Sequence, residues 1–333
     1  LDRGLLDNLL KGYMQPFWTI VMCISAYLFR TIYAGRIINI FLSVACINIL
    51  FKLTKAIADD EKAALKAARI FAYFPLTVFS CCFPIKDIYI TLGVFYAFYI
   101  FVLIQKNRKI FLAQIIYCSL LLIGVYFARG AVVEMLLVFG SIFLLDRFAK
   151  YKKYGRLLFT FIILCLVLLL LWNNIAQAFE IKIDDYGDET GLGNGINFLQ
   201  INSPWDIYKL PITYFFTSLQ PIVLNLFAAS GKSFWLNVIA HLNITMYPVA
   251  IGNFIYIFQK KKNLFFWATS FIMYCAVIIL SLGVFRHWLF LIPVQIINYS
   301  VCVTEKPNKK KYIYLFSAAL FMLIFLVTIV SSF

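Results

Sequence analysis

Charged residues beside long apolar runs are the first candidates for chemistry in this sequence. Lys86 and Asp87 are adjacent in FPIKDIYITL, Arg129 lies in a three-residue ARG connection, and Arg286 with His287 opens a later apolar run. Ionisable groups at a membrane are costly, so they usually face a protein interior or a polar cavity. Lysine and arginine in such a cavity suit a phosphate-bearing ligand. A carboxylate there suits a general base that takes a proton from an attacking hydroxyl.

Each of these residues also has a simpler structural interpretation. Asp87 could cap the N-terminus of the helix that follows it, and Lys86 could extend its ammonium toward the membrane surface. Arg129 and Glu134, about one helical turn apart, could form a structural ion pair. His287 could be an ordinary residue of the membrane interface. The sequence leaves these alternatives open.

The amino-acid composition indicates the class of protein to which these residues belong. Of the 333 residues, 63% are hydrophobic and only 14% are charged, whereas soluble domains are nearer 45–50% apolar and about 25% charged. Apolar runs long enough to cross a bilayer core of about 30 Å recur along the chain. We predict an all-α, polytopic transmembrane helix bundle of about ten spans with additional outer juxtamembrane helices. The predicted spans are 36–57, 67–83, 88–104, 110–127, 131–145, 157–172, 234–258, 264–283, 287–303 and 312–332.

The connections between these spans alternate in charge. Basic connections lie at 52–69, 105–109, 146–156, 259–263 and 304–312. These connections hold 20 of the 30 Lys and Arg residues but only 5 of the 15 Asp and Glu residues. The rest of the chain holds 10 basic and 10 acidic residues and therefore has no net charge. The positive-inside rule therefore predicts that the basic connections are cytoplasmic. The Lys86–Asp87 pair, Arg129 and Arg286 then fall on the outer face. The same rule explains the net charge of +15 without a nucleic-acid partner.

This topology divides the chain into four regions. Residues 1–35 form an outer juxtamembrane segment, in which 15–30 lies along the interface or enters it as a re-entrant piece. The alternative is an ordinary span over 15–33, and another predicted span would then be wrong. Residues 36–172 form a core of six spans, 173–233 form an outer-face loop with interfacial helices, and 234–333 form a region of four spans.

Motifs for cofactors and metals give no positive signal. The acidic run IDDYGDET (183–190) lacks the spacing of a calcium loop. The eight cysteines show no metal-type spacing, and no phosphate-binding loop, GxSxG or HExxH motif is present. No cofactor is predicted, and a divalent metal is not indicated.

Three stretches together resemble bacterial multispanning glycosyltransferases of family 39, the protein mannosyltransferase and aminoarabinose transferase type. The first combines GRIINIFLSVACINILFKLTKAI (35–57) with AARIFAYFPLTVFSCCFPIKDIYITLGVFYAFYIF (67–101). The second is VYFARGAVVEMLLVF (125–139), similar to an arginine-containing outer turn, and the third is FRHWLFLIPVQIINYS (285–300), similar to a late Arg/Pro helix. The resemblance covers roughly residues 10–300.

This resemblance implies a GT-C-like fold and a hexosyl or pentosyl transferase. The donor would be a polyprenyl-phosphate-linked sugar in the bacterial cytoplasmic membrane, and the acceptor a glycan, a lipid or a protein at the outer face. Asp87 would occupy the family's outer acidic position. Lys86, Arg129 and Arg286 would contact phosphate, and His287 would belong to the same substrate site.

The family's principal catalytic aspartate lies in the first outer loop, some 20 or more residues before the proline that corresponds to Pro16. That position precedes residue 1, so we expect a further span and this aspartate upstream, with Asp2 or Asp7 as substitutes only in an unusually short loop. The acidic residue that often precedes this proline is Gln15 here. A metal at that position is therefore not expected.

The sequence is also compatible with two other functions. An O-antigen or capsule polymerase or ligase would also use outer arginines and a large outer loop, and would join glycans carried on lipid diphosphates. A lipid or solute transporter would be expected to contain inverted repeats and helices broken by glycine or proline at mid-membrane, and the sequence shows neither.

Overall fold

The computed structural model describes residues 16–31, 33–82, 86–150, 162, 246–259, 289 and 292–331. Over these residues the chain is almost entirely α-helical and contains no strand. The prediction of an all-α fold is therefore confirmed for this part of the chain. Two compact units are distinguished, residues 1–73 with 77–164 and residues 74–76 with 165–333. The predicted outer loop at 173–233 lies outside the described residues.

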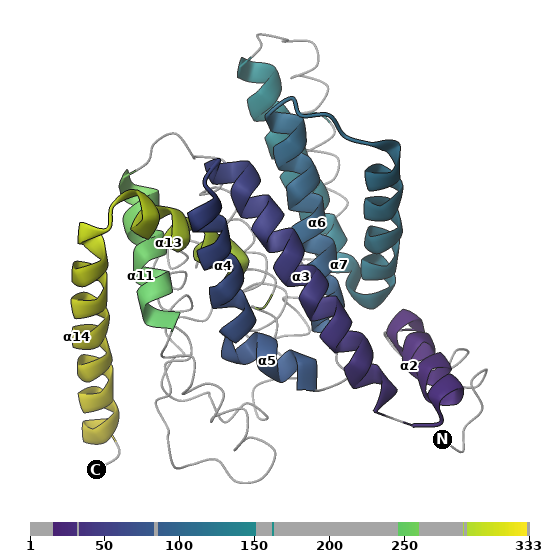
Figure 1. Ribbon diagram of the computed structural model, residues 1–333, viewed down its shortest axis with the longest axis horizontal. Coiled ribbons are helices and arrows are strands. Elements are labelled where there is room, and N and C mark those ends of the chain that lie inside the picture. Colours follow the sequence, from purple (N-terminus) through teal and green to yellow (C-terminus); the bar gives the residue numbers. More distant parts are fainter. Residues whose placement is uncertain are drawn as a thin grey trace. The chain divides into compact units, whose positions relative to one another are not determined.

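The described helices of the first unit follow one another with short connections (Figure 1). They are α2 (Pro16–Phe29), α3 (Ala34–Ala58), α4 (Glu61–Tyr73), α5 (Pro75–Cys82), α6 (Asp87–Gln105) and α7 (Leu112–Lys150), and only the first two residues of α5 are assigned to the second unit.

Three helical stretches are long and apolar enough to cross a membrane. Among the described residues, these stretches are α3, α6 and the part of α7 from Leu112 to Arg129. At a rise of 1.5 Å per residue they measure about 38, 28 and 27 Å, close to the bilayer core of about 30 Å. They match the predicted spans 36–57, 88–104 and 110–127. These helices are compatible with a membrane protein, and the count of about ten spans stays a prediction.

The predicted span 67–83 corresponds to two helices rather than one. Helix α4 begins earlier, at Glu61, after Asp60 Oδ1 accepts a hydrogen bond from the Lys62 N–H at 2.8 Å. It ends at Tyr73, and α5 begins at Pro75. Proline cannot supply the N–H that would continue α4, but it is well suited to the first turn of a new helix. The single-span interpretation was wrong for this reason.

Helix α7 folds back on itself at Arg129, where the backbone leaves the helical region (φ −164°, ψ 88°). Its first half runs antiparallel to α6 and its second half runs parallel to it. The contacts that set these directions are Tyr89 Oη to Leu121 O at 3.2 Å, the Tyr96 ring to the Tyr117 ring at 4.9 Å, and the Phe101 ring beside Gly140. The predicted spans 110–127 and 131–145, joined by ARG, have this antiparallel arrangement.

Close packing of α6 against the first half of α7 depends on a glycine. A Cβ atom at Gly93 would lie 2.6 Å from Val125 Cγ2, nearer than such atoms approach one another. Small residues at a helix interface allow two backbones to come close, which is a common basis of packing between membrane helices.

Helix α2 is too short to be an ordinary span. Its 14 residues measure about 21 Å, and it ends where Arg30 adopts a left-handed conformation (φ 52°). Trp18 is buried, with its ring centroid 6.3 Å from that of Tyr89, whereas Tyr27 is exposed. The length disagrees with a span over 15–33, and the placement of 15–30 at the outer interface stays a prediction.

The described part of the second unit contains α11 (Tyr247–Gln259), α13 (Ile292–Glu305) and α14 (Asn308–Ser331). They fall within the predicted spans 234–258, 287–303 and 312–332 or extend a few residues beyond them. Asn298 Nδ2 donates to Asn253 Oδ1 at 2.7 Å in a buried contact between α13 and α11. A Cβ atom at Gly252 would overlap the ring of Tyr299, so this glycine permits the close approach of the same two helices.

Candidate functional site

The Lys86–Asp87 pair lies at the N-terminus of α6. Asp87 is the first residue of the helix, and Lys86 is its N-cap residue, whose side chain makes no capping hydrogen bond. The helix therefore begins one residue earlier than predicted, at Asp87 rather than at Ile88. A carboxylate in the first turn is still favoured, because the N-terminus of a helix carries a partial positive charge.

Lys86 is turned into the protein rather than toward the membrane surface. Its Nζ donates a hydrogen bond to Ala128 O at 2.8 Å, and only 8% of the residue is exposed. Ala128 directly precedes the break in α7, where carbonyl groups lose helical partners and can accept from a cation. The break in one helix thus provides the acceptor for the lysine at the start of another.

Arg129 and Asp87 face each other across the same junction. Arg129 Nη2 lies 3.9 Å from Asp87 Oδ1, with 20% of the arginine side chain and 3% of the aspartate side chain exposed. This distance describes an ion pair rather than a direct hydrogen bond. The alternative partner of Arg129, the side chain of Glu134, lies outside what the structure describes.

Three of the predicted site residues, Lys86, Asp87 and Arg129, are therefore brought together. We call them the buried triad. Lys86 and Ala128 are 42 residues apart in the chain, so this contact depends on the tertiary fold. Asp2, Arg286 and His287, the other predicted site residues, lie outside the described residues.

A polar face of α3, which was not predicted from the sequence, helps to position the start of α6. Asn39 Nδ2 donates to Ser80 O at 3.1 Å, and Ser43 Oγ lies 2.7 Å from Cys81 Sγ. One turn further along, Cys46 Sγ donates to the carbonyl of Ile88 at 3.5 Å, which ties α3 directly to α6. The available signal was the i, i+4, i+7 spacing of small polar residues in an apolar helix.

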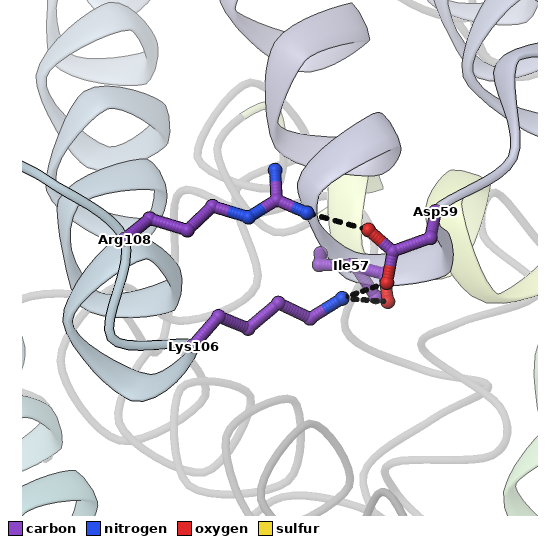
Figure 2. Close-up of polar contacts among 4 residues, drawn as sticks. All are labelled: Ile57, Asp59, Lys106 and Arg108. Carbon is purple, nitrogen blue, oxygen red and sulfur yellow. Dashed lines mark hydrogen bonds and ion pairs between the residues drawn. The ribbon is translucent and has the colours of Figure 1, made fainter.

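A second charged cluster lies at the other end of α6, among the basic connections that we predict to be cytoplasmic (Figure 2). Asp59 receives an ion pair from Lys106 Nζ and one from Arg108 Nη2, the latter at 2.6 Å. Lys106 also donates to Ile57 O at 3.2 Å. We call Asp59, Lys106 and Arg108 the exposed triad, because 59%, 30% and 46% of their side chains are accessible.

The electrostatics of the exposed triad follow from these contacts. The hydrogen bond from Lys106 lowers the pKa of Asp59, aided by the charges of Lys106 and Arg108, although partial burial acts in the opposite direction. Asp59 itself has a left-handed backbone (φ 52°) as the C-cap of α3, and its N–H bonds to Lys55 O. The cluster therefore links the C-terminal ends of α3 and α6.

Metal coordination has no candidate among the residues that the structure describes. In that part of the chain, no three His, Cys, Asp or Glu side chains are grouped as ligands of an ion would be.

Comparisons of the chain with protein-family models, with curated proteins and with solved structures found no match. The resemblance to glycosyltransferases therefore stays a prediction, as do the roles of the individual residues.

Proposed function

We propose that the protein transfers a sugar from a polyprenyl-phosphate-linked donor to an acceptor at the outer face of the bacterial cytoplasmic membrane. The observation that supports this proposal is the buried triad, in which two cations and one carboxylate from separate helices converge at the end of α6 opposite the basic connections.

The charge of the buried triad suits an anionic ligand. Two positive side chains accompany a single carboxylate, so the three residues together carry a net charge of +1 at neutral pH. Burying such charges between apolar helices is costly, and a function that needs them is a common reason for their presence. Lysine and arginine together match a phosphate that leaves with its negative charge.

The reaction assigns each component a role. The acceptor hydroxyl oxygen forms a bond to the anomeric carbon, with inversion, while the bond between that carbon and the donor phosphate oxygen breaks. Polyprenyl phosphate departs, and Lys86, Arg129 and Arg286 stabilise its charge. The hydroxyl proton passes to a carboxylate, for which Asp87 and Asp2 are the candidates.

Steady-state kinetics of sugar transfer test this assignment. The full chain is reconstituted in vesicles and incubated with polyprenyl-phosphate-linked hexoses or pentoses as donors and a cell-envelope extract as the source of acceptor. The release of polyprenyl phosphate is then measured. Arg129→Ala is expected to raise the KM for the donor about tenfold or more, because a charge-assisted hydrogen bond contributes about 1.5–3 kcal/mol. Asp87→Asn is expected to lower kcat by about 100-fold or more if Asp87 is the base.

The outcomes separate the alternatives. Asp59→Asn, which changes the exposed triad, is the matched control and should leave both constants unchanged. A rise in KM rather than a fall in kcat for Asp87→Asn would make Asp87 a positioning residue for Arg129 and leave Asp2 as the base. Wild-type rates in both variants, or activity on lipid diphosphates alone, would contradict the proposal, and the second result would favour the polymerase or ligase.

A further inference from the structure

The turn between α13 and α14 carries a concentration of positive charge. Lys306, Lys309, Lys310 and Lys311 lie within six residues, and all but Lys309 are exposed. We call these four residues the basic turn. None of them forms a salt bridge with a residue in the described part of the chain, and Lys310 Nζ lies 5.8 Å from the centre of the Tyr314 ring.

The basic turn is placed where its charge is not neutralised by the helix that follows. Lys309, Lys310 and Lys311 occupy the first turn of α14, which contains no acidic residue. The N-terminus of a helix carries a partial positive charge, so cations there are unfavourable by a few tenths of a kcal/mol each. An anion from outside the protein would relieve this repulsion.

An exposed apolar stripe continues directly from the basic turn along α14. It consists of Tyr312, Leu315, Phe316, Leu323 and Leu326, all of which are exposed. From Tyr312 to Leu326 the helix rises about 21 Å, more than the half-thickness of a bilayer core, about 15 Å. The stripe can therefore lie against the whole length of an acyl chain.

We propose that the basic turn and the apolar stripe together bind an anionic phospholipid of the leaflet next to this turn. The lysines contact the negatively charged headgroup, and the acyl chains lie along α14. Charge complementarity selects this occupant over a neutral lipid, because juxtamembrane lysines each contribute about 1 kcal/mol of attraction to an anionic surface. The alternative explanation of these lysines is the positive-inside rule, which accounts for the orientation of the helix during membrane insertion and requires no bound lipid.

Native mass spectrometry of the full chain tests the proposal with two lipids of distinguishable mass, phosphatidylglycerol and phosphatidylcholine. Wild-type protein should bind the first phosphatidylglycerol about tenfold more tightly than the first phosphatidylcholine. The variant K309Q/K310Q/K311Q should lose this preference, because it removes three of the four positive charges that attract the anionic headgroup.

Two further variants make the result specific. K52Q/K62Q/K109Q removes three exposed lysines from other basic connections and the same net charge, and it should keep the preference. K309R/K310R/K311R should keep it as well, because the positive charge is retained. An equal affinity of the wild type for both lipids, an equal loss in K52Q/K62Q/K109Q, or displacement of the lipid by inorganic phosphate at millimolar concentration would overturn the proposal.

Discussion

The two triads at opposite ends of α6 use the same residue types in different surroundings. Each combines one aspartate, one lysine and one arginine, but 59% of the Asp59 side chain is exposed and only 3% of the Asp87 side chain is. Exposed ion pairs contribute about 0–1 kcal/mol to stability. Buried charges pay a desolvation cost that their attraction often does not recover. The buried triad is therefore a poor solution for stability alone, which makes it the stronger candidate for function.

The two triads also differ in how the cations are held. In the exposed triad, Lys106 and Arg108 both contact the carboxylate directly. In the buried triad, Arg129 remains 3.9 Å from Asp87, and Lys86 donates to a backbone carbonyl. The fold therefore fixes the positions of both cations of the buried triad, one through a backbone carbonyl and one through the ion pair with Asp87.

The largest expected difference between the triads is in stability. Arg129→Ala removes the ion-pair partner of a buried carboxylate and should lower the free energy of unfolding by about 3 kcal/mol. Arg108→Ala, the matched change in the exposed triad, should cost less than about 1 kcal/mol. Unfolding in mixed micelles with increasing dodecyl sulfate, followed by circular dichroism, measures both. Equal losses in the two variants would remove the distinction between the triads.

A smaller effect is expected from pH at the exposed triad. The folded protein lowers the pKa of Asp59 below its usual value, about 3.9, so the ionised form is favoured by folding. The stabilisation is present above pH 4 and is lost as the pH falls through the folded-state pKa. It should amount to less than about 1 kcal/mol because the group is exposed.

The comparison of wild type with Asp59→Asn isolates this contribution. The difference in their free energy of unfolding should be constant from pH 5 to 7, shrink below pH 4 and decrease in 1 M salt. A difference that instead grew as the pH fell would contradict the assignment of Asp59 as the ionised partner of Lys106 and Arg108.

The limits of α3 and α6 and the reversal at Arg129 were predicted from hydrophobic runs and isolated charges. These features depend on local sequence, since a charged residue between two apolar runs marks where one helix ends and the next begins. The division at Pro75 was missed because the apolar run continues across it, although proline there begins a new helix.

The tertiary contacts of the buried triad were only partly predictable. Charge alternation indicated that Lys86, Asp87 and Arg129 share one face, but the contact of Lys86 with Ala128 O requires the backbone break in α7. The hydrogen bond from Cys46 to the carbonyl of Ile88 joins α3 to α6, and a single sequence does not show that these two helices pack together. The spacing of its polar residues identifies the polar face of α3 but does not indicate which helix packs against that face.

Binding of polyprenyl phosphate tests the central proposal most directly, because this product needs no acceptor and no knowledge of the sugar. Affinity should be measured for the full chain in vesicles, for K86Q/R129Q and for K106Q/R108Q, which removes the same two residue types from the exposed triad. We predict that K86Q/R129Q binds at least about tenfold more weakly and that K106Q/R108Q binds like the wild type. Equal affinity of all three proteins would contradict the assignment of the buried triad to a lipid phosphate.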